Sequence, residues 1–435
     1  MGGFYLKNSI TSLTPNALTA LKTELEREYQ DYVRRDLKLD MSRGKPAPKQ
    51  LDLCNGMLSM DLKYRTENGT DARNYGVMDG LPECKAFFAE LLDLDPKQIV
   101  IGGNSSLAMM YDQVSRLMLF GTGVEPAWKT CQDAGRKIKF LCPVPGYDRH
   151  FKICEAMNIE MIPVPLHEDG PDMELISGLV RADEMIKGIW CVPLYSNPQG
   201  VCYSDQVVGQ LANLETAAKD FRIFWDNAYA IHPIYQAVPL ASIFKAVNRS
   251  GGENRIYYFF STSKISFPGA GVAMMASGAK SIAEIKKHMS AQTISYDKLN
   301  QLRHLQYFQS ADGMKGHMRE LADLLRPKFD MVLSKLQDQL GGTGLAKWST
   351  PRGGYFISLD TYPGCAKEVV SLAGQAGVKL TEAGATYPYG LDENDSNIRI
   401  APSYPELEEL DTAMDLLCIC VKLAGVDKLL RIQEG

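Results

Sequence analysis

Short apolar segments alternate with segments of helical periodicity between about residues 97 and 265. This alternation is typical of a mostly parallel sheet that is covered by helices. The apolar residues from Leu107 to Met118 recur at helical spacing and predict a helix that packs on the sheet. The segments that we predict as strands are residues 98–101, 138–142, 159–164, 186–192, 221–225 and 255–260.

The two ends of the chain have a different pattern. The first 40 residues are helical in periodicity, and after residue 315 a long helix at 318–340 precedes a strand at 354–359 and an amphipathic helix at 407–423. We therefore predict an α/β protein with a large domain and a smaller α+β domain that both chain ends build. The predicted boundaries are 61–315 for the large domain, with 1–60 and 316–435 forming the small one.

Composition narrows the class of protein. The 435 residues are 45% hydrophobic and 23% charged, with a net charge of −5, which is typical of a soluble globular protein. A slightly acidic chain argues against nucleic acid or an anionic membrane as the main partner. No run of about 18 apolar residues predicts a membrane span, and the first residues lack a signal-peptide core, so we expect a cytoplasmic protein. The ten cysteines have no zinc-site spacing, and no metal site is predicted.

Candidate chemistry lies where the predicted strands end, because parallel sheets bind ligands at the carboxyl ends of their strands. Asp226 directly follows an apolar strand, so its buried charge needs a cationic or donor partner. Lys264 lies among hydroxyls and apolar residues, where its pKa can fall and its amine can act as a nucleophile. Gly103 to Ser105 open a helix, and Tyr147 and Asn197 lie in turns. Taken one at a time, these last residues fit a helix cap, a packed aromatic and a self-capping turn better than a ligand site.

Taken in order, the segments resemble one family. YGVMDG, GGNSS, PGYDRH, SNPQG, WDNAY, STSK and NIRIAPS are similar to the motifs of the fold-type I aminotransferases, which depend on pyridoxal 5′-phosphate (PLP). The resemblance extends from about Ser42 to Ser403. GYDRH and SKISFPGAG most resemble the bacterial aspartate aminotransferases of subgroup Ic.

This resemblance implies catalytic roles for three residues. Lys264 would bind the cofactor aldehyde covalently and, once substrate displaces it, move the proton between Cα and the cofactor. Asp226 would pair with the pyridine nitrogen, and Tyr229 would hydrogen-bond the phenolic oxygen together with Asn197. Tyr147 would stack on the cofactor ring. A further expectation is that His150 orients Asp226.

The resemblance also implies sites for the cofactor phosphate and the substrate carboxylate. Tyr75 would reach the phosphate of the partner subunit's cofactor, which implies a homodimer with shared active sites. Arg399 would clamp the substrate carboxylate, with Asn197 beside it and Gly44 closing over it. The residues expected to hold the phosphate within the same chain are Gly103, Asn104, Ser105, Ser261 and Ser263.

One segment departs from the family pattern. Most members carry a phosphate-binding arginine a few residues after the lysine, but here the stretch from Pro268 to Val272 contains no basic residue. Lys298, Arg303 and His304 are candidates for a second anion site. The anion at that site could be the phosphate or the side-chain carboxylate of a dicarboxylic substrate, or these residues could meet only other protein groups.

The function that follows is transamination from an L-amino acid, with L-aspartate preferred, to 2-oxoglutarate. The reaction would follow a ping-pong mechanism through pyridoxamine phosphate. The same fold with aromatic, alanine or 2-aminoadipate specificity is one alternative, as is a β-eliminating lyase. A PLP-binding regulatory sensor is another, although such proteins usually carry a basic helix-turn-helix segment, and the first 40 residues here are rich in acidic residues.

Overall fold

A sheet of eight strands forms the centre of the molecule in the computed structural model, which describes residues 9–434. Six strands run in the same direction, while β9 and β5 run against them. In spatial order the strands are β2 (Ile99–Ile101), β9 (Ala273–Ala276), β8 (Ile256–Ser261), β7 (Arg222–Asp226), β6 (Ile186–Cys191), β3 (Lys139–Val144), β4 (Glu160–His167) and β5 (Gly170–Pro171).

Both faces of this sheet are buried. Successive residues of β7 alternate between two apolar clusters: Ile223 and Trp225 pack on one face, and Phe224 packs on the other. Burial on both faces explains why these strands are continuous apolar runs rather than alternating ones. The helices that connect and cover the sheet are α4 (Pro82–Leu92), α5 (Ser106–Phe120), α6 (Trp128–Asp133), α7 (Asp148–Ala156), α8 (Met173–Ala182), α9 (Asp205–Ala212), α10 (Ala279–Gln292) and α11 (Lys298–Phe308).

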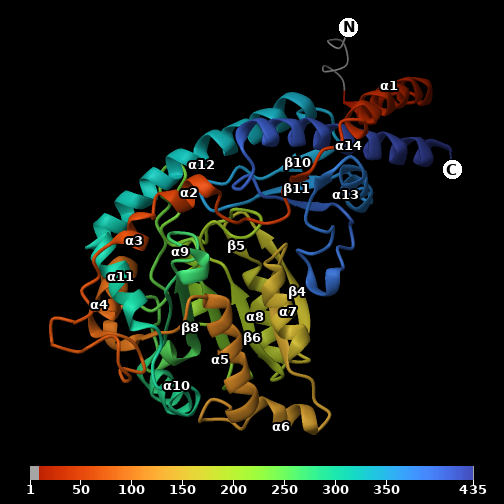
Figure 1. Cartoon of the computed structure of the whole chain (residues 1–435). Coiled ribbons are helices and arrows are strands. Elements are labelled where there is room, and N and C mark those ends of the chain that lie inside the picture. Colours follow the sequence, from red (N-terminus) through yellow and green to blue (C-terminus); the bar gives the residue numbers. More distant parts are fainter. Residues whose placement is uncertain (1–8, 435) are drawn as a thin grey trace.

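The first and last helices of the described chain lie beside a second, three-stranded antiparallel sheet (Figure 1). Its strands are β10 (Ala346–Trp348), β11 (Ile357–Thr361) and β13 (Asn397–Ile400). The helix α12 (Ala311–Leu340) runs from the level of α11 to this sheet along one side of the molecule (Figure 1). Helix α1 (Pro15–Val33) packs on α14 (Leu407–Glu434). The other α-helices and strands of the described residues are α2 (Pro48–Asp52), α3 (Gly56–Ser59), α13 (Ala366–Gln375), and the paired β1 (Leu39–Asp40) and β12 (Val378–Lys379).

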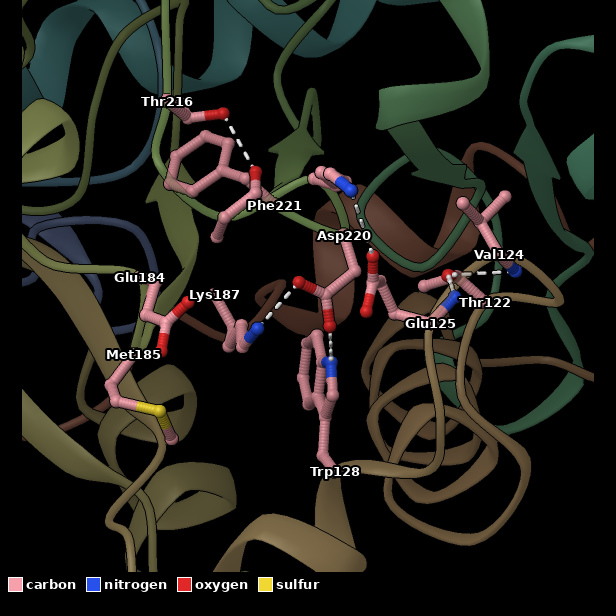
Figure 2. A network of polar contacts seen from close by, with 12 residues as sticks. Thr122, Val124, Glu125, Trp128, Glu184, Met185, Lys187, Thr216, Asp220 and Phe221 are labelled. Atoms are coloured by element: carbon pink, nitrogen blue, oxygen red, sulfur yellow. Dashed lines mark hydrogen bonds and ion pairs between the residues drawn. The ribbon is translucent and has the colours of Figure 1, made fainter.

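A polar network lies at the amino ends of β6 and β7 (Figure 2). Asp220 is 2% exposed and accepts from Lys187 Nζ at 2.6 Å and from Trp128 Nε1 at 2.8 Å. Both carboxylate oxygens therefore have a strong donor, as a buried charge requires. This network links α6 to the amino ends of the strands, opposite the carboxyl end of β7 where Asp226 lies.

The predicted mostly parallel sheet is confirmed, and the six predicted strands lie within three residues of the observed bounds. The predicted strand at 354–359 appears as Ile357–Thr361, and the predicted helix at 318–340 begins earlier, at Ala311. Strand β9 was not predicted, because its four residues, Ala-Met-Met-Ala, lack β-branched side chains. Among the described residues, none of the helices combines the length and apolar character needed to cross a membrane.

Candidate active site

The polar residues predicted at the strand ends meet at one edge of the central sheet. β2, β3, β6, β7 and β8 all point toward this edge, because β2 is antiparallel to β9 and β9 is antiparallel to β8. Asp226 is the last residue of β7, Ser261 is the last residue of β8, and Asn197 follows β6. The parallel topology therefore brings together side chains from distant parts of the sequence.

Asp226 is 3% exposed and has only one of its oxygens paired. His150 Nε2 donates to Asp226 Oδ2 at 3.0 Å, and the His150 ring stacks on Trp190 at 4.3 Å between centroids. Within residues 9–434, Asp226 Oδ1 has no hydrogen-bond partner. A buried carboxylate oxygen without a donor is costly, so this atom is suited to a cationic or donor group from outside the chain.

The Lys264 amine lies near the same carboxylate, between two aromatic rings. Its Nζ is 5.0 Å from the Tyr229 ring centroid and 5.8 Å from that of Tyr355. Burial lowers the pKa of the Lys264 amine, with a smaller rise from the charge of Asp226 and a smaller fall from that of Arg399. A lowered pKa increases the neutral, nucleophilic fraction of the amine near neutral pH.

Two tyrosines expected at the cofactor also lie in this region. Burial raises the pKa of Tyr229 and of Tyr147, and the charge of Asp226 raises both further. Both phenols therefore stay protonated at neutral pH and can donate hydrogen bonds. The Tyr147 ring contacts the edge of His150 at 5.0 Å between centroids.

The predicted phosphate-binding residues form one polar cluster. Ser261 Oγ donates to Ser263 Oγ at 3.1 Å, Ser263 Oγ donates to the Asn104 carbonyl at 3.2 Å, and Asn104 Nδ2 donates to the Pro268 carbonyl at 3.1 Å. Ser105 caps the N-terminus of α5, with its side chain accepting from the Ala108 amide at 3.4 Å. Gly103 is exposed at the start of this turn. A helix N-terminus with adjacent hydroxyls and free amides is suited to an anion.

Arg399 lies on β13 and faces a cavity of about 780 Å³ that it shares with Lys264, Tyr147 and Asn197. Its Nη1 donates to Asp148 Oδ1 at 2.9 Å and to Asn197 Oδ1 at 3.3 Å. Its buried Nε has no partner within residues 9–434. The guanidinium therefore keeps a donor for a further acceptor such as a carboxylate.

Gly44 also lies on the wall of this cavity, and the reason for a glycine here is steric. A Cβ at Gly44 would lie 2.4 Å from Cζ of Phe356, whose ring also lies beneath Arg399, 5.0 Å from its Cζ. Any larger residue would displace the Phe356 ring or the segment that carries Gly44. The glycine thus allows the chain to approach the guanidinium closely.

Tyr75 does not join the site of its own chain. Its side chain is 79% exposed, in a loop whose next residue, Gly76, accepts from Lys298 Nζ at 2.9 Å. Of the candidates for a second anion site, Lys298 therefore meets a protein carbonyl, and Arg303 Nη1 meets Asn300 Oδ1 at 3.3 Å. His304 is bonded to Thr262, Ser266 and Asn300.

Several residues of the site were not predicted. Asp148 lies in the GYDRH segment but received no role, and Thr381 and Phe356 lie in segments without a motif. Thr381 Oγ1 accepts from Arg399 Nη2 at 3.4 Å, and Tyr355 OH donates to the Lys264 carbonyl at 3.4 Å. The adjacency of Asp148 to Tyr147 was the only available signal among these residues.

Comparisons with known proteins identify the family. The family model described as "Aspartate amino-transferase" matches residues 13–433. A Mycolicibacterium smegmatis protein assigned to the aminotransferases is 47% identical, over 97% of this chain and 99% of its own. An aspartate aminotransferase of Corynebacterium glutamicum is 42% identical over 93% of each chain. The solved structure of an aspartate transaminase from Corynebacterium glutamicum has a TM-score of 0.93 at 40% identity, covering 97% of this chain and 99% of its own.

The fold and the site thus define a fold-type I enzyme of the PLP-dependent class. The chain belongs to the aspartate aminotransferase family and is an aminotransferase, acting on amino acids and 2-oxo acids. PLP is the cofactor that this family implies, and the residues present fit it. Three features support this fit: the oxygen of Asp226 that has no partner within residues 9–434, the buried Lys264 amine that feels the charge of Asp226, and the polar cluster at the N-terminus of α5.

Proposed function

We propose that this enzyme transfers the amino group of L-aspartate to 2-oxoglutarate by a ping-pong mechanism through pyridoxamine phosphate. The observation that carries the proposal is the shared cavity, which is lined by both the Lys264 and the Arg399 side chains. Such an arrangement can hold the substrate α-carboxylate while the lysine amine takes the proton from the adjacent Cα. The relative from Corynebacterium glutamicum that is named an aspartate aminotransferase supports the choice of substrate.

When bound, PLP supplies an electron sink for the negative charge that develops at the substrate Cα. Asp226 would keep the pyridine nitrogen protonated through its unpaired Oδ1, while His150 holds the carboxylate in place through Oδ2. Lys264 would hold the cofactor and later take the proton from Cα, which its lowered pKa favours. Tyr229 and Asn197 would donate to the phenolic oxygen, and Tyr147 would cover the ring.

The phosphate would bind to the cluster of Gly103, Asn104, Ser105, Ser261 and Ser263. Gly271 occupies the stretch where most of the family carries an arginine, and a Cβ there would face Thr262 Oγ1 at 3.1 Å and the Asn104 carbonyl at 3.2 Å. Neutral donors and the N-terminus of α5 would therefore carry most of the charge compensation within the chain.

The charge of the cavity supports a dicarboxylic substrate. Seven cationic side chains line it, against three carboxylates. Two of the carboxylates are engaged, since Asp148 binds Arg399 and Glu155 accepts from Lys152 Nζ at 2.6 Å. The surplus of positive charge favours a substrate with two negative groups, such as aspartate or 2-oxoglutarate.

We also propose a homodimer with shared active sites. Its basis is Tyr75, which is largely exposed in its own chain and would meet the cofactor phosphate of the partner. The division into a large domain at 61–315 and a small domain from both ends belongs to the same proposal. Movement of the small domain would bring Gly44 and Arg399 onto the substrate carboxylate.

An amino-donor panel tests the proposal. Purified enzyme would be incubated with PLP and each amino acid, and absorbance would report conversion of the cofactor to its amine form. We expect L-aspartate and L-glutamate to convert it, with oxaloacetate formed from aspartate. Failure of every dicarboxylic donor would contradict the substrate assignment, and turnover of aromatic donors or alanine would replace it. Lys264→Ala is the control and should form no oxaloacetate.

A further inference from the structure

Three of the six histidines contact the short segment that carries Lys264. His232 lies in the loop after β7, His304 on α11 and His317 on α12. Their side chains are buried, at 3%, 2% and 7% exposure. They approach residues 262–266 from three separate elements, and none of them lines the cavity that holds Arg399.

Two of these histidines donate to backbone carbonyls. His232 Nε2 is 3.3 Å from the carbonyl oxygen of Lys264, and His317 Nε2 is 2.7 Å from that of Ile265. A carbonyl oxygen only accepts, so each ring carries its proton on Nε2. Tyr355 OH adds a second donor to the Lys264 carbonyl at 3.4 Å.

His304 has the opposite tautomer. Its Nδ1 donates to the Asn300 carbonyl at 2.8 Å, so Nε2 of the neutral ring is an acceptor. Ser266 Oγ at 2.8 Å and Thr262 Oγ1 at 3.1 Å are the hydroxyls within reach. Thr262 Oγ1 also accepts from the Val272 amide at 2.9 Å, which ties the two ends of the turn together.

The rings keep these roles because they stay uncharged. Burial lowers the pKa of His304 to about 4 and that of His232 to about 3, and the charge of Lys264 lowers the latter further. Burial lowers the pKa of His317 as well. A neutral imidazole keeps one donor and one acceptor, whereas protonation of His304 would turn its acceptor into a second donor facing the hydroxyls.

We propose that His232, His304 and His317 are positioning residues, which fix the backbone on both sides of Lys264 and thereby aim its amine at the cofactor. This inference rests on the proposed role of Lys264. A lysine side chain has four rotatable bonds, so its amine is held in reacting geometry only if the backbone that carries it is fixed. Hydrogen bonds from three elements supply that restraint without adding charge beside the amine.

The test combines local hydrogen exchange with cofactor binding. The reporters are the amides of Ile265 and Ser266, which donate to the Thr262 carbonyl, and the amide of Val272. The variants are His232→Phe, His304→Phe and His317→Phe, each with a glutamine counterpart that restores the donor or acceptor at Nε2. His288→Phe is the control, because His288 lies on α10 and stacks on Phe120 of α5, away from this segment.

We expect exchange in residues 262–272 to accelerate about tenfold in the phenylalanine variants, while exchange in the central strands stays as in the parent enzyme. Affinity for PLP and kcat should each fall about tenfold, with KM for the amino acid within about twofold, because Arg399 is untouched. Glutamine should recover most of each loss, and His288→Phe should change nothing.

Ser266→Ala keeps the test decisive if a histidine variant does not fold, because it removes the hydroxyl bonded to His304 with little loss of packing. Unchanged exchange in residues 262–272 in Ser266→Ala and in the folded histidine variants would overturn the inference. Equal losses in the phenylalanine and glutamine variants would also overturn it, because packing alone would then be at work. Borohydride reduction and mass spectrometry of the parent enzyme separately report whether PLP is bound at Lys264, so failure of that role is recognised independently.

Discussion

Two buried aspartates at opposite ends of β7 have opposite hydrogen-bonding states. Asp220, just before the strand, accepts from Lys187 and Trp128 through its two oxygens. Asp226, the last residue of the strand, accepts from His150 through one oxygen and has no partner for the other within residues 9–434. The two residues are almost equally buried, at 2% and 3% exposure. Burial alone therefore does not distinguish them.

The charge of Asp220 is compensated during folding, whereas that of Asp226 is compensated in part only by ligand binding. At Asp220 the chain itself supplies the compensating charge, so the interaction is complete when folding is complete. At Asp226 the fold leaves part of the compensation to a bound group. Ligand binding can then release the cost of the buried charge, as expected at functional sites. We therefore expect mutations at the two positions to affect different measurements.

The largest effect is expected for Asp226→Asn. Loss of the carboxylate removes the group that would stabilise a protonated pyridine nitrogen, and kcat should fall about 10² to 10³-fold. The unfolding free energy should change by less than about 1 kcal/mol, because the substitution can replace Oδ1, which has no partner within residues 9–434. Steady-state kinetics and urea unfolding measure the two quantities. Retained activity with lost stability would assign Asp226 the same role as Asp220.

Asp220→Asn is expected to show the reverse. It leaves the ammonium of Lys187 buried without a counter-charge, which should lower the unfolding free energy by about 3 kcal/mol. The activity per folded molecule should stay within about twofold, because the network lies at the far edge of the sheet. Urea unfolding and active-site titration with PLP check this. The double variant Asp220→Asn with Lys187→Met should recover part of the stability.

Smaller effects are expected from a matched pair of variants that remove the hydrogen-bond donors of the two aspartates. His150→Phe keeps a ring to stack on Trp190 but removes the bond to Asp226, and Trp128→Phe removes the bond to Asp220. A hydrogen bond to a charged group contributes about 1.5 to 3 kcal/mol. We expect His150→Phe to lower kcat at least about tenfold, and Trp128→Phe to lower the unfolding free energy. If both variants lost stability and neither lost kcat, the proposed difference between Asp226 and Asp220 would be contradicted.

The sequence predicted one of the two aspartates for a physical reason. A charge directly after an apolar strand must be buried, and in a parallel sheet it must lie at the ligand-binding edge, which identified Asp226. Asp220 precedes its strand, and its partner Lys187 is 33 residues away, so no local pattern joins them. The same limit applies to Thr381 and Phe356, whose contacts with Arg399 and Gly44 depend on tertiary packing.

The strand order was only partly predictable. Alternation of strands and helices predicts parallel neighbours, but β9 is four residues long and runs against its neighbours, so it has no crossover signature. Gly103, Asn104 and Ser105 were identified by resemblance, and their link to Ser263 comes from tertiary packing. The role of His304 could not be predicted, because it depends on the tautomer that its two contacts impose.

The smallest expected effect concerns the unfolding free energy at acidic pH and its dependence on His304. His304 has a folded pKa of about 4, lowered from 6.5 mainly by burial and slightly by Arg303, while the Asn300 carbonyl and Asp297 oppose the shift. The unfolded chain therefore binds more protons than the folded one between pH 4 and 6.5, so stability is lost as the pH falls through this window. His304 should contribute a loss of about 1 kcal/mol between pH 6.5 and 5.5. His304→Gln should flatten this part of the urea-unfolding profile. An unchanged slope in His304→Gln would show that His304 does not titrate with folding in this window.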